Sequence, residues 1–241
     1  MVVEGYEEIS NALESGARPR TLYYCPSLVR DDAELSLLAR VHGTGAELVE
    51  LSTRAFEKAS YRDSPDGWLA LVPMIPTDLG RLQLRPDALV LVCESVEKPG
   101  NLGAMLRTAD AAEIDAVVTA DGVTDWGNPN IVRASKGSIF SVPVAEAGAD
   151  EVIGWLRAHE LVIIATTPTA DATFVMPDMR RGAAIVVGSE QSGLSHAWLE
   201  EADARVRIPM FGRVNSLNVA TTAALVIYEA LRQRGRLSEG Q

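Results

Sequence analysis

Residues able to do chemistry gather in three stretches of this 241-residue chain, each where an apolar strand is expected to give way to a helix. The first, residues 94–109, holds Asn101, Gly103 and Arg107. Asn101 stands where a helix N-cap belongs, and Gly103 lets another backbone come close. Arg107 follows one and a half turns later and can reach back toward the same helix end. Taken alone, Asn101 could be either a cap or a catalytic residue.

The second stretch, residues 187–194, places Glu190 between Gly188 and Gly193. Gly188 would let a ligand approach the backbone, and Glu190 would hydrogen-bond to that ligand or orient it. In isolation the same residues could form a tight turn with a solvated glutamate. The sequence contains neither GxGxxG nor GxxxxGK[ST], so it supports neither a dinucleotide site nor a P-loop.

The third stretch, residues 208–220, begins as a short apolar strand and passes through a Gly-Arg loop into a helix. The helix is expected to start at Ser216-Leu217-Asn218, because apolar residues follow at helical spacing. Ser216 and Asn218 can therefore cap the helix or hold a ligand at its positive N-terminal end.

The elements that position these stretches predict an α/β fold. From residue 88 onward, continuous apolar strands alternate with helices, a pattern typical of a mostly parallel sheet covered on both faces. Ligands of such sheets bind beyond the carboxyl ends of the strands, where all three stretches lie. Strands are expected at residues 88–93, 116–119, 161–165, 184–187 and 206–210, and helices at 102–112, 152–159, 195–201 and 217–232.

The region before residue 88 predicts a smaller α/β domain, residues 1–75. Residues 76–87 are assigned as a linker, because the surrounding segment is rich in proline and has no clear period. The second domain is expected over residues 88–236, with 237–241 as a tail. In the first domain, helices are expected at residues 4–15, 33–41 and 55–59, and strands at 21–24, 46–51 and 68–72.

The charge balance, 33 acidic against 22 basic residues, gives a formal net charge of -11. Such a chain does not bind long nucleic acid by charge alone, so an RNA substrate would need a local basic patch. Cys25 and Cys93 are far apart and lack a CxxC partner, which argues against a disulfide scaffold or a zinc site and fits a reducing cytosol. The N-terminus lacks a secretory pattern and no apolar run could span a bilayer, so a cytoplasmic protein without membrane contact is expected.

Together, the three stretches resemble the motifs of the SpoU (TrmH-type) RNA ribose 2'-O-methyltransferases of the SPOUT class. The matching residues are Asn101-x-Gly103-x-x-x-Arg107-Thr108-Ala109, Val187-Gly188-Ser189-Glu190-x-x-Gly193-Leu194, and Ile208-Pro209-Met210 through Ser216-Leu217-Asn218-Val219-Ala220. The resemblance implies a C-terminal trefoil knot, S-adenosylmethionine as the cofactor, no metal, and a homodimer formed through the knotted domain.

The resemblance also implies roles for single residues. The family often assigns Arg107 the role of the base, but a guanidinium stays protonated at neutral pH. We therefore expect Arg107 to hold an RNA phosphate and to stabilise the forming alkoxide instead. The implied catalytic residues are Asn101, Arg107, Glu190, Ser216 and Asn218. The implied cofactor-binding residues are Thr166, Gly188, Ile208, Met210, Ser216, Leu217 and Asn218.

The first domain resembles, more weakly, the small ribosomal-protein-like RNA-binding domain that precedes this catalytic domain in several rRNA methyltransferases. This second resemblance favours 23S ribosomal RNA over tRNA as the substrate. Both housekeeping methylation and methylation that confers antibiotic resistance remain open. Trp126 could stack on a splayed base or pack at the dimer or domain contact. The expected RNA contacts are Arg18 and Arg20 in the first domain, and Arg107, Arg133, Lys136 and Arg213 near one edge of the second domain's sheet.

Two alternatives have a different character. A non-catalytic RNA-binding protein could keep the same fold, although intact Asn101, Arg107 and Glu190 argue against it. An unknotted α/β ligand-binding domain could carry the motifs by chance. Cofactor binding together with methyl transfer to RNA would separate an enzyme from both.

Overall fold

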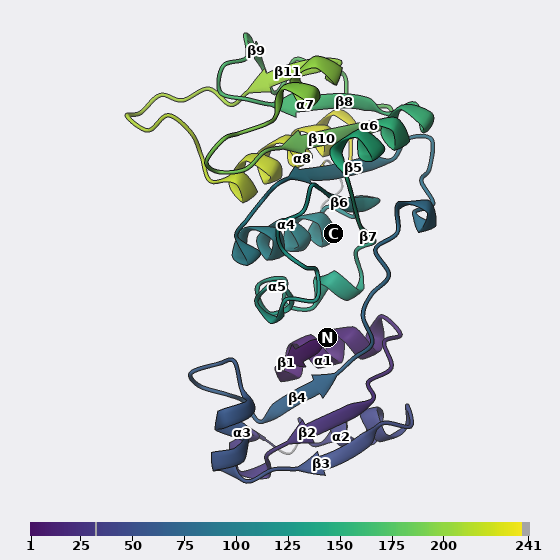
Figure 1. The fold of residues 1–241 in the computed structure, drawn as a ribbon, viewed down its shortest axis with the longest axis vertical. Helices are drawn as coiled ribbons and strands as arrows, with labels where there is room; N and C mark the ends of the chain where they lie inside the picture. The colour runs from purple at the N-terminus through teal and green to yellow at the C-terminus, as the bar shows by residue number, and fades with distance from the viewer. Residues whose placement is uncertain (32, 238–241) are drawn as a thin grey trace. The chain divides into compact units, whose positions relative to one another are not determined.

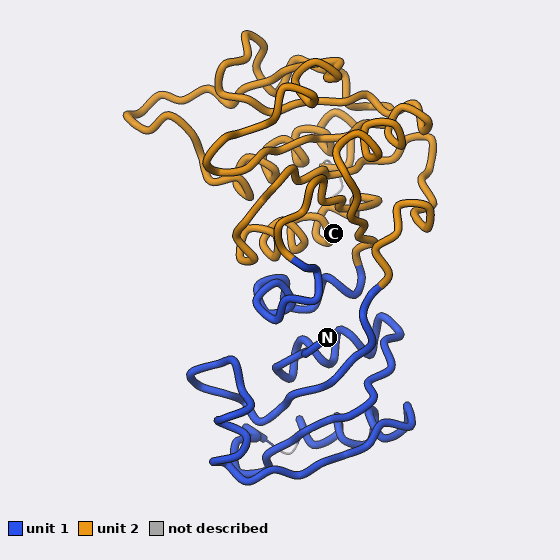
Figure 2. Tube along the Cα trace, viewed as in Figure 1, with its two compact units in different colours: residues 1–75, 125–141 blue, residues 76–124, 142–241 orange. Residues whose placement is uncertain are grey.

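The computed structural model describes residues 1–31 and 33–237. Contacts divide the chain into two compact units, which Figure 2 shows in two colours. Only Leu237 of the predicted tail 237–241 falls among the described residues. Unit 1 comprises residues 1–75 and 125–141, and unit 2 comprises residues 76–124 and 142–241.

This division differs from the predicted domain boundaries in two places. Residues 125–141, assigned by sequence to the second domain, belong to unit 1. Residues 76–87, assigned as a linker, belong to unit 2 and contain the short 3-10 helix η2 (Leu79–Arg81). Leu79 is buried in the core of unit 2, and Leu82 and Leu84 pack against that core. These leucines fix a segment whose proline content suggested a free connection.

Unit 1 contains a four-stranded sheet in the order β1-β4-β2-β3 (Figure 1). Its elements are β1 (Val2–Glu4), α1 (Tyr6–Glu14), β2 (Thr21–Tyr24), η1 (Pro26–Leu28), α2 (Ser36–His42), β3 (Glu47–Glu50), α3 (Thr53–Ala59), β4 (Trp68–Leu71), α5 (Pro129–Ala134) and η3 (Ser138–Phe140). Strand β2 runs parallel to β3, and the other pairs are antiparallel. The first helix was predicted two residues too early, because Val3 and Glu4 pair with β4 as a strand and Gly5, at φ 113°, makes the turn into α1.

Unit 2 contains a seven-stranded sheet in the order β7-β6-β5-β10-β8-β11-β9. Every neighbouring pair is parallel, which confirms the predicted α/β fold. Besides η2, the elements of unit 2 are β5 (Leu89–Glu94), α4 (Pro99–Ala111), β6 (Ala116–Ala120), β7 (Val144–Ala147), α6 (Ala149–Ala158), β8 (Val162–Thr166), β9 (Ala172–Thr173), β10 (Ala183–Val187), α7 (His196–Glu201), β11 (Ala204–Arg207) and α8 (Val219–Gln233).

The central strands β5 and β10 are buried along their whole length, because helices cover both faces of the sheet. Val90 and Val92 of β5 share a core cluster with residues of α6 and with Trp198 of α7. Cys93 points to the opposite face, where its sulfur lies 3.8 Å from the sulfur of Met105 on α4. Burial raises the pKa of the Cys93 thiol, as expected of a cysteine that serves as a small core residue.

Three features of the sheet differ from the sequence prediction. Strand β11 ends at Arg207, so residues 208–210 begin the following loop rather than finish the strand. Strands β7 and β9 were not predicted; both are short and form the two edges of the sheet. Edge strands are only half covered, so they lack the continuous apolar run that marks a central strand.

The register brings the carboxyl ends of the central strands level with one another. Cys93 of β5 pairs with Val187 of β10, and Ala165 of β8 pairs with Val186. Residues that follow these strands therefore emerge side by side at one edge of the sheet. Since β11 also pairs in parallel with β8, the loop after residue 207 leaves from the same edge.

Candidate active site

A cavity of about 730 Å³ lies at this edge of unit 2. Its wall is made from the segments that follow β8, β10 and β11, together with the first turns of α8. All seven residues predicted to bind the cofactor line it: Thr166, Gly188, Ile208, Met210, Ser216, Leu217 and Asn218. Glu190 lines the same wall, so two of the three motif stretches meet in one concave surface.

The loop after β10 closes tightly because Gly188 has no side chain. A Cβ atom at this position would lie 2.2 Å from the carbonyl carbon of Gly193 and 2.4 Å from the amide nitrogen of Leu194. Ser189 and Gly193 form an isolated antiparallel bridge across the loop, and Gly193 has a φ of +69°. Only glycine suits the close approach at residue 188, as the sequence pattern indicated.

A buried carboxylate ties this loop to the neighbouring strand. Glu94, the last residue of β5, is 4% exposed and accepts a hydrogen bond of 2.8 Å from the backbone N–H of Ser195. Nearby, the amide of Gln191 lies 3.4 Å from the carboxylate of Glu97. Glu94 was not among the residues predicted to form the site. An acidic residue that ends a wholly apolar strand is the signal that could have identified it.

The first motif joins the other two through a short chain of amide contacts. The Nδ2 atom of Asn101 donates to the carboxylate of Glu190. The Nδ2 atom of Asn218 donates to Oδ1 of Asn101 at 3.1 Å, and Oδ1 of Asn218 accepts from the backbone N–H of Ala220 at 3.0 Å. An ionised glutamate only accepts hydrogen bonds, so it fixes which way each amide must point.

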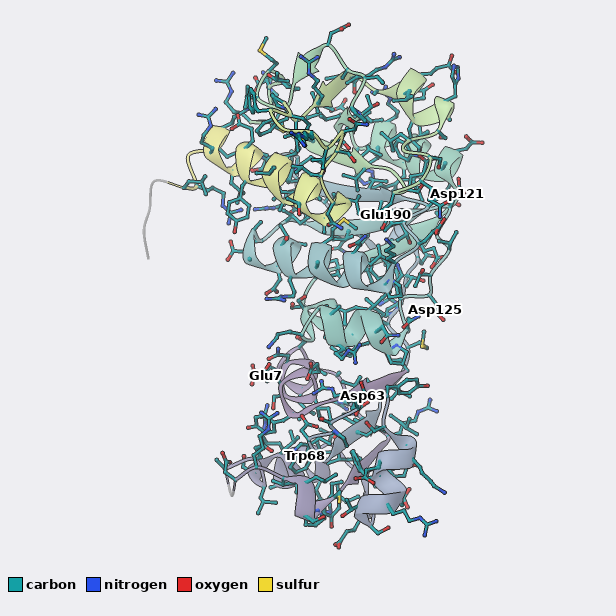
Figure 3. The ribbon with its side chains drawn as sticks, turned by 90° about the vertical axis from the view of Figure 1, so that its left-hand side faces the viewer. Glu7, Asp63, Trp68, Asp121, Asp125 and Glu190 are labelled. Carbon is teal, nitrogen blue, oxygen red and sulfur yellow. The ribbon has the colours of Figure 1, made fainter. Side chains whose placement is uncertain are left out.

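We call Glu190, Asn101 and Asn218 the amide relay. Figure 3 shows Glu190 next to the N-terminal end of α8, where Asn218 is the N-cap residue. Asn218 thus confirms one predicted cap. Ser216 does not cap the helix, which begins three residues later; it is exposed and lines the cavity instead.

The start of α4 also differs from the prediction. The helix begins at Pro99, with Lys98 as its N-cap residue, so Asn101 lies in the first turn rather than at the cap. Proline suits the first helical position because its missing N–H would be unsatisfied there anyway. This shift of the helix start frees the Asn101 amide to contact Glu190 and Asn218.

Arg107 does not line the cavity wall of the single chain. It is exposed on α4 and forms no hydrogen bond or ion pair with any residue of 1–31 or 33–237. Six residues of helix turn it by about 600°, so its side chain leaves α4 about 120° away from Asn101. The expected reach back toward the start of the helix is therefore not formed here.

The residues predicted to contact RNA are distributed over both units. Arg18 and Arg20 are exposed in unit 1, and Arg213 is exposed in the loop before α8. Arg133 and Lys136 were predicted beside the sheet of the second domain, but they belong to unit 1, where Arg133 ends up on helix α5. The pattern of strands and helices could not reveal that α5 packs in unit 1, because the residues before and after 125–141 in the sequence belong to unit 2.

Two of these cations already have partners within unit 1. Arg133 donates to Oδ1 of Asn130 at 3.2 Å. Lys136 forms an ion pair of 3.0 Å with Glu7, and this contact lowers the pKa of the Glu7 carboxyl. Trp126, considered as a base-stacking residue, is 1% exposed and therefore has no free face for a nucleotide.

The cavity has the properties that S-adenosylmethionine requires. Its volume lies within the range of small-molecule sites, and its wall mixes apolar side chains with a few polar groups. Thr166, which donates to the Val186 carbonyl at 2.9 Å, and Asn218 hold fixed positions in that wall. The absence of a side chain at Gly188 keeps the backbone of this loop within reach of a ligand.

Comparison with known proteins agrees with this geometry. The model of the SpoU rRNA Methylase family matches residues 88–228, and that of the MRM3-like substrate binding domain matches residues 1–70. A 23S rRNA (uridine(2479)-2'-O)-methyltransferase of Streptomyces viridochromogenes is 33% identical over 97% of this chain and 83% of its own length. The 23S rRNA (guanosine(2553)-2'-O)-methyltransferase RlmP of Bacillus subtilis is 31% identical over 94% of this chain and 86% of its own.

Solved structures show the same likeness. The SpoU methyltransferase AviRb of Streptomyces viridochromogenes, in complex with the cofactor AdoMet, has a TM-score of 0.88 and 31% identity, covering 97% of this chain and 90% of its own. Within the described residues, none of the helices combines the length and apolar character that a membrane span requires. The motifs, the fold and the family match lead to one conclusion: this chain belongs to the SpoU rRNA methylase family.

Proposed function

We propose that this protein transfers a methyl group from S-adenosylmethionine to a ribose 2'-hydroxyl of 23S ribosomal RNA. The observation that carries this proposal is the convergence of the seven predicted cofactor-binding residues and Glu190 on one cavity, with the amide relay beside it. The relatives that match this chain over nearly its whole length carry the names of 23S rRNA 2'-O-methyltransferases.

When bound, S-adenosylmethionine supplies an electrophilic methyl group on a sulfonium. The cavity wall would bind this cofactor through the backbone at Gly188, Ile208 and Leu217 and through the side chains of Thr166 and Met210. Enclosure on a fixed wall aligns the reacting atoms, and such alignment supplies about 7 to 11 kcal/mol in well-oriented reactions.

The amide relay would keep the loops at the cavity in register. Glu190 orders the Asn101 amide, and Asn101 in turn holds Asn218 at the start of α8. Asn101 would position the ribose or the side chain of Arg107. Ser216 and Asn218 would shape the floor on which the cofactor rests.

Arg107 would bind the RNA phosphate next to the target ribose and stabilise the alkoxide that forms at the 2'-oxygen. Its guanidinium stays protonated, so the 2'-hydroxyl proton leaves to a phosphate oxygen or to water. Arg107 is exposed on α4 and has no partner among the described residues, so its guanidinium is accessible to an RNA phosphate.

Unit 1 would bind part of the ribosomal RNA other than the target ribose. Its match to the MRM3-like substrate binding domain and the exposed Arg18 and Arg20 support this role. Arg133, Lys136 and Arg213 would add phosphate contacts, giving an acidic protein a salt-dependent RNA affinity of modest slope.

We further propose that the C-terminal segment of unit 2 passes through a preceding loop to form a trefoil knot, and that unit 2 forms a homodimer in the cytoplasm. Leu225 and Tyr228 support the dimer, since both are exposed apolar residues three positions apart on α8. Light scattering combined with size-exclusion chromatography tests this assembly, and a monomeric mass at micromolar concentration would contradict it.

The function is tested with purified protein, radiolabelled S-adenosylmethionine and an unmodified 23S rRNA transcript. We expect incorporation of the label at one ribose, located as a 2'-O-methylated position by reverse transcription and by resistance of that linkage to alkali. Transcripts of 16S rRNA and tRNA serve as controls. No cofactor binding by calorimetry, or label recovered only in bases or only in tRNA, would refute the proposal.

A further inference from the structure

The loop between β11 and α8 leaves the cavity wall and then returns to it. Met210 and Asn215 line the cavity, whereas the four residues between them do not. Figure 1 shows this loop extending away from the sheet of unit 2, at the left of the view. We call residues 211–214 (Phe-Gly-Arg-Val) the finger. Its base belongs to the cofactor cavity, so anything that contacts its tip stands close to the reacting groups.

The finger exposes an aromatic side chain in this position. Phe211 is 98% exposed and Val214 is 65% exposed, and Arg213 is exposed between them. Single exposed apolar residues are ordinary on protein surfaces and need no explanation. Phe211 is distinguished by its place between two residues of the cavity wall and by the cation two positions further on. An aromatic face with a neighbouring arginine is the combination that single-stranded nucleic acid binds.

We propose that Phe211 stacks on the base of an unpaired nucleotide in the RNA substrate, either the target nucleotide or its immediate neighbour. This inference rests on the proposed function, because methylation requires the target ribose to enter the cavity beside the finger. Phe211 directly follows Met210 of the cavity wall, so its ring is placed to meet the base of that ribose or of a neighbouring nucleotide. In a paired helix both faces of each base are covered by neighbouring bases, so a stacking contact selects an unpaired or splayed nucleotide.

A second copy of this chain is the other occupant to consider. A copy seated on the finger would lie against the cavity wall at Met210 and Asn215 and compete with the ribose for that space. RNA must occupy that space for the reaction to proceed, and its phosphates complement the exposed Arg213. Burial of Phe211 by a second copy is therefore an outcome of the test rather than a second proposal.

The test compares Phe211→Ala, Phe211→Leu and Phe211→Tyr in methyl transfer to the unmodified 23S rRNA transcript. We expect kcat/KM to fall about 5- to 150-fold in the alanine variant, mainly through KM, which is the range seen when base-stacking aromatic residues are truncated. The leucine variant should lose nearly as much, because it keeps apolar volume without an aromatic face. The tyrosine variant should stay within about twofold of the wild type, since it keeps the ring that stacks.

Met176→Ala is the matched control, because Met176 is 72% exposed in unit 2 but lies away from the cavity wall. It should change nothing. Affinity for S-adenosylmethionine, measured by calorimetry, should stay within about twofold in all four variants. Salt gives a second readout: the loss in Phe211→Ala should be equal at low and moderate salt, whereas the loss in Arg213→Gln should shrink as salt rises.

Three results would overturn the inference. The first is wild-type kcat/KM in Phe211→Ala, and the second is full activity in Phe211→Leu. The third is a change of oligomeric mass in Phe211→Ala, which would assign Phe211 to contact between copies. Each of these is distinct from failure of the proposed function, in which the wild-type protein itself would not bind S-adenosylmethionine or methylate the transcript.

Discussion

The two ends of the parallel sheet in unit 2 both carry a concave surface, but only the one at the carboxyl ends of the strands is lined by the predicted site residues. At the carboxyl ends of the strands lies the cavity of about 730 Å³. At the amino ends lies a second hollow of about 580 Å³. The second hollow is the more highly charged; its lining residues are Arg85, Asp87, Glu113, Arg180, Gln233, Arg234 and Arg236.

The arginines of the second hollow are already satisfied by the chain. Arg85 binds both carboxylate oxygens of Asp115, at 2.8 and 3.2 Å. Arg180 does the same with Asp178, and Arg236 pairs with Glu113. Arg234 donates to three backbone carbonyls, those of residues 179, 87 and 181, at 2.8, 2.7 and 2.6 Å. The hydrogen bonds and ion pairs of this hollow connect the end of α8 to the segments that precede the strands.

The comparison shows that charge and concavity do not by themselves mark a functional site. What distinguishes the carboxyl end is polar side chains that hydrogen-bond to one another rather than to the rest of the chain: the Asn101 amide contacts Glu190 and Asn218. Arg107, further along α4 and outside the cavity wall, has no partner within the described residues. We therefore expect substitutions at the carboxyl end to lower the rate of methyl transfer and substitutions at the amino end to lower the stability of the fold.

The largest effect is expected from Arg107→Lys. The substitution keeps the positive charge but loses the planar fork that binds phosphate through two bonds. We expect kcat to fall about 100-fold or more, similar to the loss of one donor that stabilises a developing oxyanion. Arg81→Lys, at an exposed arginine of η2, serves as the control. Near-full activity in Arg107→Lys, measured by label incorporation, would remove Arg107 from the proposed mechanism.

Asn101→Ala should come next, with a fall in kcat/KM of roughly 30-fold and little change in melting temperature. The variant removes the middle of the amide relay but leaves the helix caps intact. Asn218→Ala should reduce the rate and also cost about 1 kcal/mol of stability, because Asn218 caps α8.

The double variant Asn101→Ala/Asn218→Ala sharpens this prediction. Residues in one hydrogen-bonded network are not additive, so the combined loss of rate should be smaller than the product of the two single losses. Purely multiplicative losses would show that the relay does not act as a unit.

The parallel sheet and the location of the cavity could be predicted from sequence because both depend on local pattern. Buried central strands such as β5 and β10 are mostly continuous apolar runs. Gly188 marks the close approach of the loop after β10 to its own backbone, where a side chain would not fit. The cavity contacts of Thr166 and Met210 came from the family resemblance, not from the pattern.

The remainder depended on contacts between residues far apart in sequence. Trp126 and Phe211 make the point: both are aromatic residues in loops, yet Trp126 is buried and Phe211 is almost fully exposed. No local pattern separates them, because burial depends on what the rest of the fold places nearby. The same holds for Glu94, whose partner Ser195 is 101 residues away.

A smaller effect, on stability alone, is expected at the amino end from Arg234→Met. The substitution keeps the side-chain stem but leaves three carbonyls without their charged donor. We expect a loss of about 2 kcal/mol after water replaces part of the bonding, and a fall in melting temperature of about 4 to 8 °C. Cofactor affinity should be unchanged. Arg181→Met, at an exposed neighbour, should stay within about 0.5 kcal/mol, and a large rate loss in Arg234→Met would break the comparison.

The smallest effect is a dependence of stability on pH at the same end of α8. Arg232 donates to both oxygens of Glu229, at 2.7 and 2.8 Å, and Gln233 donates at 2.9 Å; the bonds from Arg232 and Gln233 lower the pKa of the Glu229 carboxyl. Gln233 also donates to the Pro177 carbonyl, so the network connects α8 to the segment before β10. Because the pKa is lowered in the folded chain, the unfolded chain binds the proton more readily as the pH falls.

The contribution of Glu229 is therefore complete above the pKa of an unfolded glutamate, about 4.3, and is lost as the pH falls below it. Glu229→Gln should lower the free energy of unfolding by about 0.5 kcal/mol at pH 7; the effect is small because Arg232, the partner of Glu229, is exposed to solvent. The difference from wild type should vanish near pH 3. Thermal unfolding from pH 7 to pH 3 measures it, with Glu151→Gln on α6 as the control. A difference that persists at pH 3 would show that Glu229 acts by packing rather than by its charge.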